Sequence, residues 1–466
     1  MGNKDKINQF AERIVNTKYE DLTEREILYS KLSLLDLIGV TLAGTTQGNM
    51  CQKLVKFAKD QGGTKEATLW GYGGKLPAMM AAFANGSVNH SLDFDQCFDI
   101  SGTHPGVSTV PSAVALMEKT NNLSGKELLV NMTTSCDFVY RVARAISVDA
   151  QKSYGVFAAF AYSFFGASAA AGRALKLDVD QMVNCIGLGF GQLCGNMQVL
   201  YETDCNIREI FPAFGNKAGV LAACLAKEGV NGIKNVLEGP AGFFNAFGRG
   251  DYDPEKLIVK AGDPFMNVQV TTKPYPSCRQ THMFVDATRL IVEENSIKAT
   301  DIDNVTLRVG KFGEVLCIPE KTRRKPPLPM DAKFSNIYCV AAYLTRGKLG
   351  VAEFNKESLK DPEILKLASE IKFERDDENI DMASSLVEPG GVTIHCKDGR
   401  EFTKYVTASL GSPDNPMTKE DVISKFKDCA AYSIKTLSNK DIDMIIDMCL
   451  NLDQVNDIRK LIEIFS

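Results

Sequence analysis

Apolar residues at helical spacing run through the first 265 residues of this chain, and this pattern constrains the fold more than any other feature. The stretch from Ser30 to Ala43 shows the spacing of one helix face, with apolar residues at Leu34, Leu35, Ile38 and Leu42. Further segments of this kind fall near 109–118, 127–147, 155–176 and 216–228. Strand-like alternation is scarce here, so we predict that this part of the chain is helical throughout.

The pattern changes after about residue 265, where short stretches alternate between apolar and polar residues. Such alternation is typical of half-buried β-strands, and it is found at 305–309 and again at 392–396. The pair Asp398-Gly399 supplies a two-residue hairpin turn into a further strand over 402–406. This segment therefore predicts an α+β module.

Helical periodicity returns near the end of the chain, where Thr418 is placed to cap a helix over 419–429. One apolar face of the last helix is formed by Val455, Ile458, Ile462 and Phe465. We therefore expect a mainly α fold, in which both chain ends build one large all-helical domain that is interrupted by a smaller inserted α+β domain. The predicted parts are 1–265 for the first helical part, 266–410 for the inserted domain and 411–466 for the second helical part.

Composition excludes several classes of protein. With 44% apolar and 24% charged residues over 466 positions, the chain is an ordinary globular protein, neither disordered nor fibrous. A formal net charge of −5 argues against a nucleic-acid partner, which binds a basic face. The basic run Lys321–Lys325, next to three prolines, predicts a solvated loop. Thirteen cysteines without a Cys-x-x-Cys pair indicate reduced thiols in a cytoplasmic protein.

We expect no membrane or targeting segment. The polar start Met1–Lys6 lacks the apolar core of a signal peptide. The stretch from Gly155 to Gly172 is uncharged, but it consists mainly of Ala, Gly, Ser and aromatic residues, which is typical of a tightly packed buried helix. The glycine-rich run Gly187–Gly195 lacks the preceding strand of a dinucleotide site, so close helix packing is the better explanation.

The residues most suggestive of chemistry lie between positions 90 and 106. This stretch holds two of the four histidines of the chain and three carboxylates, namely His90, His104, Asp93, Asp95 and Asp99. Such a density of acid/base groups indicates catalysis, and we predict a loop between two helices, where catalytic groups often lie. A divalent cation held by the three aspartates and His104 is the alternative. Because the spacing matches no calcium or zinc loop, no metal is expected.

A second constellation runs from Lys273 to Ala287. Two prolines prevent an early helix, and Ser277 is placed to cap a helix that starts at Cys278. The first-turn amides, together with Lys273 and Arg279, would then hold a carboxylate. The alternative, that Ser277 merely caps the helix and Arg279 merely pairs with a surface acid, stays open.

The chain resembles the MmgE/PrpD family over nearly its whole length. The motifs that carry the resemblance are Leu35–Gly39, Ala67–Gly71, Asn85–Gly86, His90–Asp95, His104–Pro105, Leu237–Pro240, Gly242–Phe244, Lys273–Cys278, His282, Asp286–Ala287, Phe334–Tyr338 and Asn415–Thr418. The family implies a large helical domain built from both chain ends, a smaller inserted α+β domain, a homodimer, and a cofactor-free site between the domains.

The resemblance also implies roles for individual residues. The residues carried over as catalytic are Asp93, His104, Lys273 as the anion-binding or proton-donating lysine, and Tyr338. Those expected to bind the substrate are Cys97, Phe157, Arg208, Ser277, Cys278, Arg279 and His282. Four positions depart from the pattern of the decarboxylating members: Cys97 replaces a hydroxyl residue, Phe157 a histidine, Arg208 a lysine and Cys278 a histidine. The change at Phe157 removes a polar, potentially cationic group from where the resemblance places a bound tricarboxylate.

These residues indicate proton transfer at a carbon next to a carboxylate. Lys273, Arg279 and Arg208 supply positive potential for an enolate-like charge. His104 is the best general acid or base, since its reference pKa is about 6.5, and Asp93 would orient it or act as partner base. Alternatively, His104 merely bonds the backbone and Asp93 merely caps the following helix.

We therefore predict a cofactor-independent lyase that dehydrates or decarboxylates a small di- or tricarboxylate. The predicted partners are this carboxylate substrate and a second copy of the chain, with neither nucleic acid nor membrane. Two alternatives stay open. One is an epimerase or isomerase of a small dicarboxylate that uses the same acid/base groups, and the other is a non-catalytic binding protein.

Overall fold

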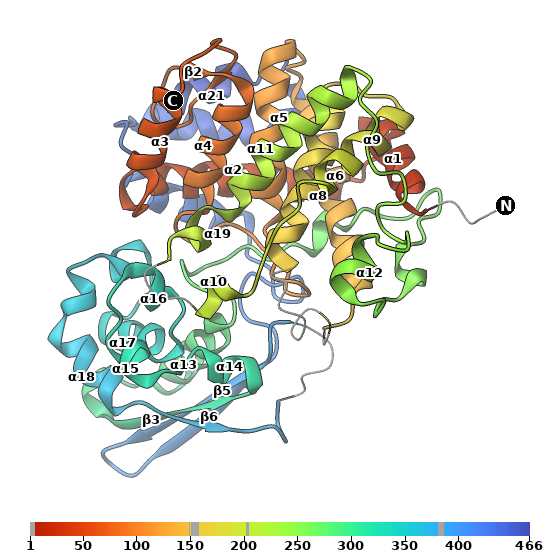
Figure 1. Ribbon diagram of the computed structural model, residues 1–466. Coiled ribbons are helices and arrows are strands. Elements are labelled where there is room, and N and C mark those ends of the chain that lie inside the picture. The colour runs from red at the N-terminus through yellow and green to blue at the C-terminus, as the bar shows by residue number, and fades with distance from the viewer. Residues whose placement is uncertain (1–4, 149, 151–157, 202–204, 381–385) are drawn as a thin grey trace. The chain divides into compact units, whose positions relative to one another are not determined.

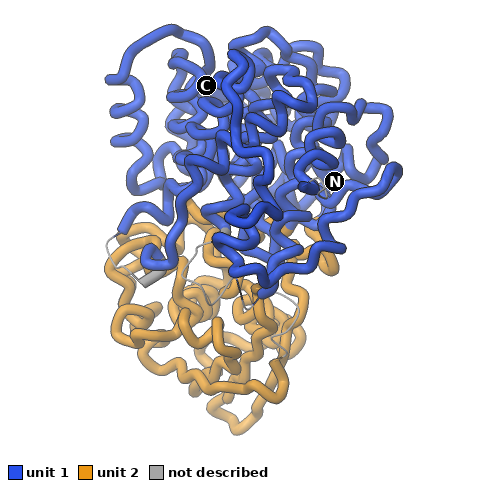
Figure 2. The backbone as a smooth tube through the Cα atoms, turned by 45° about the vertical axis from the view of Figure 1, so that its right-hand side comes forward, with its two compact units in different colours: residues 1–91, 95–270, 418–466 blue, residues 92–94, 271–417 orange. Residues whose placement is uncertain are grey.

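The computed structural model describes residues 5–148, 150, 158–201, 205–380 and 386–466 of the chain (Figure 1). Within these residues the chain is mainly helical, with small β-sheets, which confirms the expected mainly α class. Two compact units divide it (Figure 2): unit 1 comprises residues 1–91, 95–270 and 418–466, and unit 2 comprises residues 92–94 and 271–417. The domain boundaries expected from the sequence, at 265/266 and 410/411, stay predictions.

Unit 1 is a helical assembly with one small β-hairpin. Its helices are α1 Ile7–Asn16, α2 Glu24–Gln47, α3 Cys51–Asp60, α4 Ala78–His90, α5 Pro105–Thr120, α6 Gly125–Ala145, α8 Ala158–Ala174, α9 Val179–Phe190, α10 Gln198–Tyr201, α11 Ile207–Lys227, α12 Phe243–Gly248, α19 Lys419–Ala430, α20 Asn439–Leu450 and α21 Arg459–Phe465. The hairpin pairs β1 Ala67–Thr68 with β2 Lys75–Leu76. The helices predicted near 30–43, 109–118, 127–147 and 216–228 are confirmed as α2, α5, α6 and α11.

The long helix α2 lies in the core of unit 1. A capping box starts it, because Thr23 and Glu26 each accept a hydrogen bond from the other's backbone amide. By length and composition α2 would be able to cross a membrane, the one such helix among the described residues. However, 67% of its most apolar window is buried inside the protein, as expected for a core helix.

Small residues let the central helices of unit 1 approach closely. A Cβ atom at Gly215 of α11 would lie 2.5 Å from the hydroxyl of Ser163 in α8, and one at Gly219 would lie 2.5 Å from the backbone of Ala167. Both separations are shorter than van der Waals contact allows, so glycine is required at both positions. The described part of the uncharged stretch 155–172 is therefore a buried, tightly packed helix, as predicted.

A buried asparagine ties α11 to α5, the helix that begins beside the acid/base loop. Pro111 lies inside α5 and has no N–H, so the carbonyl of Val107 lacks its helical donor. The side-chain amide of Asn216 donates to this carbonyl at 2.7 Å, and its oxygen accepts from the amide of Ser112 at 3.1 Å. These bonds hold the first half of α5, and with it the position of His104.

Unit 2 combines a four-stranded sheet with short helices. Its strands are β3 Ile302–Val309, β4 Lys372–Arg375, β5 Gly390–Cys396 and β6 Glu401–Val406, in the order β4-β3-β5-β6. Only β3 and β4 are parallel. Its helices are α13 Thr281–Asn295, α14 Lys311–Val315, α15 Glu320–Arg324, α16 Pro329–Lys333, α17 Asn336–Arg346 and α18 Pro362–Glu370. Helix α13 lies against β5 and β6, and α17 packs against α13 (Figure 1).

Several local predictions can be compared with this structure. The strands β3, β5 and β6 are confirmed, as is the helix α19 that Thr418 caps. The last helix, α21, begins only at Arg459, and β4 was not predicted. The solvated loop expected at Lys321–Lys325 is wrong. Residues 321–324 of this segment belong to α15, in which Arg323 is buried and donates to the carbonyl of Ile318.

Candidate active site

Two histidines and an aspartate of unit 1 meet where α4 ends and α5 begins. His90 is the last residue of α4, and His104 is the N-cap of α5, which confirms the predicted loop between two helices. Asp95 lies in this loop, with Oδ1 2.9 Å from Nδ1 of His90 and Oδ2 3.0 Å from Nδ1 of His104. His90 is 2% exposed, Asp95 1% and His104 8%, so the cluster is buried.

The Asp95 carboxylate stays ionised in this cluster. Burial alone would raise its pKa, but the charges of His104 and His90 and the hydrogen bonds from both rings hold the pKa of Asp95 well below its ordinary value. An ionised carboxylate accepts hydrogen bonds and donates none. Nδ1 of each imidazole is therefore the donor, and Nε2 of His104 is the nitrogen that can gain or lose a proton.

Aromatic side chains line this cluster. The ring of Phe211 in α11 lies 4.7 Å from that of His90 and 6.2 Å from that of His104, measured between centroids. The two imidazole rings lie 4.5 Å apart in an edge-to-face arrangement, and Phe160 packs against Phe211. Such apolar surroundings keep water away and strengthen the electrostatic interactions of the imidazoles.

Two of the predicted substrate-binding residues lie in the same unit. Arg208 is buried in α11, one turn before Phe211. Cys97 is buried in the loop, and its Sγ lies 3.9 Å from a carboxylate oxygen of Asp99. Phe157, which the family resemblance places where decarboxylating members have a histidine, lies outside the described residues. Its predicted role stays untested.

Asp93 belongs to the short segment 92–94 of unit 2. Its backbone has φ of +50°, a left-handed conformation that residues other than glycine rarely adopt. Such strain persists only where surrounding bonds hold it, and it is frequent at functional sites. An unusual backbone conformation therefore accompanies a residue already predicted to be catalytic.

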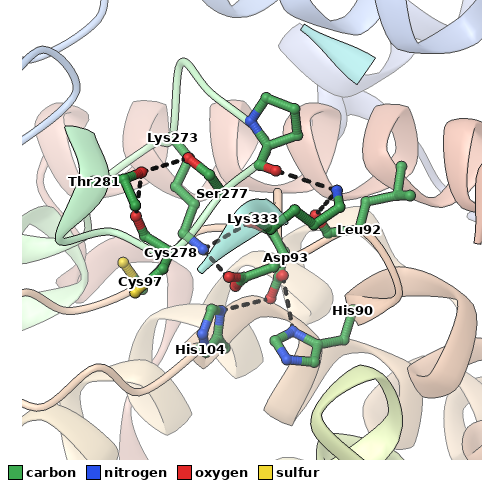
Figure 3. A network of polar contacts seen from close by, with 12 residues as sticks. His90, Leu92, Asp93, Cys97, His104, Lys273, Ser277, Cys278, Thr281 and Lys333 are labelled. Carbon is green, nitrogen blue, oxygen red and sulfur yellow. Dashed lines mark hydrogen bonds and ion pairs between the residues drawn. The ribbon is translucent and has the colours of Figure 1, made fainter. Parts of the chain in front are cut away.

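Lys273 holds Asp93 in this conformation. Its Nζ donates to Oδ1 of Asp93 at 2.6 Å and to the backbone oxygen of the same residue at 2.8 Å (Figure 3). Both side chains are almost fully buried, at 1% and 6% exposure. Two residues 180 positions apart in the sequence, both predicted to be catalytic, are thus brought together as a buried ion pair.

Lys333 is a buried residue of this region that sequence reasoning missed. Its Nζ donates to the backbone oxygen of Leu92 at 2.6 Å (Figure 3). It also donates to the backbone oxygen of Pro276 at 3.1 Å and lies 4.9 Å from the centroid of the Phe354 ring. It therefore ties the segment that carries Asp93 to the turn that follows Lys273. In the sequence Lys333 has the appearance of a surface lysine on a short helix, and no local pattern distinguishes it.

The turn after Lys273 differs from the prediction. Helix α13 begins at Thr281 with Gln280 as N-cap, so the expected helix start at Cys278, capped by Ser277, is wrong. The amide of Cys278 donates to the carbonyl of Lys333 at 2.9 Å, which holds this residue in a turn. Its amide is therefore unavailable to an anion. The hydroxyl of Ser277 bonds that of Thr281 at 2.7 Å instead of capping a helix.

The remaining predicted binding residues of unit 2 lie in or next to this turn. Burial and the charge of Asp93 raise the pKa of the Cys278 thiol to about 12, so it is neutral at physiological pH. His282 is fully buried, with Nε2 3.3 Å from the carbonyl of Ser277 and its ring edge-to-face with Tyr275. Arg279 is buried, and one of its nitrogens lies 3.5 Å from the carbonyl of Leu410.

Tyr338 lies in the core of unit 2. The residue is fully buried in α17 among apolar side chains, and its hydroxyl donates to the backbone oxygen of Glu353 at 2.8 Å. Burial raises the pKa of this phenol far above physiological pH. A structural hydrogen bond is thus observed for Tyr338, and its catalytic role stays a prediction.

Among the described residues of unit 1, His90, Asp95 and His104 are also a group that could hold a metal ion. One ligand atom from each of these residues lies within 4.8 Å of the others. Two imidazoles and a carboxylate are a known ligand set for divalent transition metals. Both Nδ1 atoms, however, are at hydrogen-bond distance from Asp95, and the absence of a metal that we expected from the sequence stays a prediction.

Comparisons with known proteins agree with the family resemblance. The model of the MmgE/PrpD N-terminal domain matches residues 8–255, and that of the C-terminal domain matches residues 275–452. The chain is similar to the cis-aconitate decarboxylase of Homo sapiens, with 27% identity over 96% of this chain and 92% of that protein. It is also similar to those of Mus musculus (25%; 97% and 92%) and Aspergillus terreus (24%; 85% and 83%).

Proposed function

The chain belongs to the MmgE/PrpD family and is an enzyme of the lyase class, and we propose that it decarboxylates a small tricarboxylate of the cis-aconitate type without a cofactor. The names of its relatives support decarboxylation over dehydration. The unpaired pattern of the thirteen cysteines suggests that it acts in the cytoplasm, the family resemblance suggests a homodimer, and both are part of the proposal.

The proposed reaction breaks one C–C bond and forms one C–H bond. When a carboxylate leaves as CO₂, its bonding electron pair moves into the neighbouring double bond and carboxylate as an enolate-like charge. A proton then adds to carbon, so the carbon skeleton is neither oxidised nor reduced. The enzyme must therefore stabilise a developing negative charge and supply one proton.

His104 is the proposed proton donor. Asp95 bonds its Nδ1, which stabilises the imidazolium form and leaves proton exchange to Nε2. The apolar wall of Phe211 and Phe160 keeps water away from the imidazole rings, so that the proton goes to substrate carbon instead. Acid catalysis by a positioned imidazole contributes about 10²–10⁴-fold to a rate.

Lys273 and Asp93 are proposed to act on the substrate carboxylates and the developing charge. The Lys273 ammonium is buried and preorganised, so it costs little reorganisation when negative charge develops nearby. Asp93 holds this ammonium and takes up a proton if one must be moved. Arg208 and Arg279 are proposed to bind the remaining carboxylates, as predicted from the sequence.

The single observation that carries the proposal is the buried His90–Asp95–His104 cluster. Burying a carboxylate between two imidazoles costs desolvation free energy, whereas burying apolar side chains in the same place would not. Folding of unit 1 therefore does not explain these residues, whereas proton transfer does.

The proposal is tested by adding cis-aconitate to the protein in D₂O and following CO₂ release and the proton NMR spectrum of the product. Wild-type protein should form a decarboxylated product that carries one solvent deuteron on carbon. His104→Ala and Lys273→Ala should each lower kcat about 10²–10⁴-fold. Matched controls are His395→Ala and Lys404→Ala, which remove partly exposed surface ion pairs and should keep rates within twofold.

Three results would overturn the proposal. Near-normal turnover by both site variants would dismiss these residues as catalytic. Deuterium incorporation into unchanged substrate without CO₂ release would indicate an epimerase or isomerase. Release of water from a hydroxy acid, with every carboxyl group retained, would indicate a dehydratase.

A further inference from the structure

A single carboxylate in unit 1 bonds two imidazoles, and the family resemblance assigned a role neither to it nor to the second ring. Oδ1 of Asp95 bonds Nδ1 of His90 at 2.9 Å, and Oδ2 bonds Nδ1 of His104 at 3.0 Å. Both rings therefore present the same nitrogen to one acceptor. Deletion of Asp95 would leave both rings without the bond that selects their tautomer.

The arrangement also restrains the orientation of both rings. His90 is fixed at the end of α4 and His104 at the start of α5, so Asp95 joins two helix ends. The rings pack edge to face, and Phe211 contacts both. Rotation of either imidazole would break a bond to a buried charge and disturb this packing, which costs more than rotation of a solvated ring.

We propose that Asp95 and His90 are positioning residues that fix His104 in the Nδ1–H form, with Nε2 as the nitrogen that exchanges its proton with the substrate. Asp95 selects the tautomer of His104. His90 bonds the other oxygen of Asp95 and so holds the carboxylate in the plane that His104 requires. This inference rests on the proposed function only for the last step, the transfer to substrate.

The same principle is known from catalytic triads, in which an aspartate holds a histidine in the productive tautomer and its replacement by asparagine lowers kcat about 10⁴-fold. Here one aspartate bonds two rings. An asparagine at position 95 offers one oxygen and one NH₂ group. It is thus able to accept from one Nδ1–H, while the other ring must turn its Nδ1 into an acceptor.

The direct test is nitrogen NMR of the full chain labelled with ¹⁵N-histidine. The chain contains four histidines, namely His90, His104, His282 and His395. Protonated and unprotonated ring nitrogens have well separated shifts, and the variants His90→Asn and His104→Asn assign the signals. In the wild-type protein, Nδ1 should be protonated in both His90 and His104. In Asp95→Asn, one of the two rings should change to the Nε2–H form.

Kinetics of two His90 variants give a second readout. An asparagine side chain retains a donor close to the position of Nδ1, whereas leucine has none. His90→Asn should keep kcat within about threefold of wild type. His90→Leu should lower kcat about 10–100-fold, the usual effect of losing such a supporting partner, with KM changed less than threefold. A merely space-filling role would predict the reverse order, since leucine replaces the apolar bulk of the ring better.

The outcomes separate this inference from the proposed function. An unprotonated Nδ1 in wild-type His104, or tautomers that do not change in Asp95→Asn, would overturn the inference. The inference would also be overturned if one equivalent of Zn²⁺ moved the Nδ1 signals of His90 and His104 to the chemical shifts of metal-bound nitrogen. The cluster would then be a metal site. The predicted ring protonation in a protein that does not decarboxylate cis-aconitate would support the inference and refute the proposed function.

Discussion

Replacing Lys273 by methionine removes the ammonium that bonds Asp93 inside unit 2. Its Nζ makes two hydrogen bonds to this residue, at 2.6 and 2.8 Å, from a side chain that is 1% exposed. Such charge-assisted bonds contribute about 1.5–3 kcal/mol each. Removing one partner of a buried ion pair costs about 3–5 kcal/mol, because the other charge stays buried. We therefore expect Lys273→Met to lower the unfolding free energy of unit 2 by about 3–5 kcal/mol.

A second substitution separates the structural role of the pair from its catalytic one. Adding Asp93→Asn to Lys273→Met removes the buried charge that the first change leaves unpaired. The double variant should regain at least half of the lost stability, since the two effects are not additive. Its turnover should nevertheless stay about 10²–10³-fold below wild type, because neither charge is there to act on the substrate.

Differential scanning calorimetry measures the stability change. In a unit of about 150 residues, each kcal/mol shifts Tm by about 2–4 °C, so Lys273→Met should melt on the order of 10 °C lower. Lys404→Met is the matched control, since it loses only a partly exposed pair with Glu294 and should shift Tm by less than about 2 °C. A Lys273→Met protein with the same Tm as wild type would refute this reasoning, and so would a double variant with a lower Tm than the single one.

Three further predictions concern neighbouring residues. Lys333→Met should lower kcat about 10–100-fold, because the segment that carries Asp93 loses the hydrogen bond from Lys333 to the backbone oxygen of Leu92. An unchanged kcat in steady-state assays would contradict this. The low pKa of Asp95 stabilises the fold above its ordinary value near 3.8, and this stability is lost as pH falls through the lower folded pKa. The Tm difference between wild type and Asp95→Asn should therefore shrink as pH falls below about 4. The Cys278 thiol, with a pKa of about 12, should react with iodoacetamide at pH 8 far more slowly than exposed Cys194, as followed by mass spectrometry; equal rates would contradict this raised pKa.

Local sequence patterns predicted most of the secondary structure. Helical spacing located α2 and α6, alternation located β3 and β5, and Thr418 was identified as an N-cap because a capping residue acts within its own turn. These features depend on neighbours along the chain. The short edge strand β4, with mostly polar and exposed residues, has no comparable local signal.

Two local predictions were wrong because contacts between residues far apart in the sequence, or buried contacts, decide the structure there. Ser277 has the sequence context of a cap, but the amide of Cys278 bonds Lys333, 55 residues further along the chain, and the helix starts later. Arg323 was assigned to a solvated loop, although its guanidinium is buried against a backbone carbonyl. Neither contact is visible in local composition.

The candidate site was predictable in its residue types but not in its pairing. The density of acid/base groups at 90–106 pointed to catalysis, and Asp93, His104 and Lys273 were singled out. The sequence does not tell which carboxylate meets which base. In the structure Asp95 bonds Nδ1 of His104, a role considered for Asp93, while Asp93 pairs with Lys273. This choice depends on the backbone conformation of the loop, including the positive φ at Asp93.

The central claim is that this chain removes a carboxyl group from a tricarboxylate. The most direct measurement uses cis-aconitate labelled with ¹³C in its carboxyl groups and follows the carbon NMR spectrum during incubation. We predict that labelled CO₂ and bicarbonate accumulate in a one-to-one ratio with a dicarboxylate product, and that in His104→Ala both signals appear about 10²–10⁴-fold more slowly. Substrate that keeps all three labelled carboxyl groups in the presence of folded wild-type protein would contradict the account.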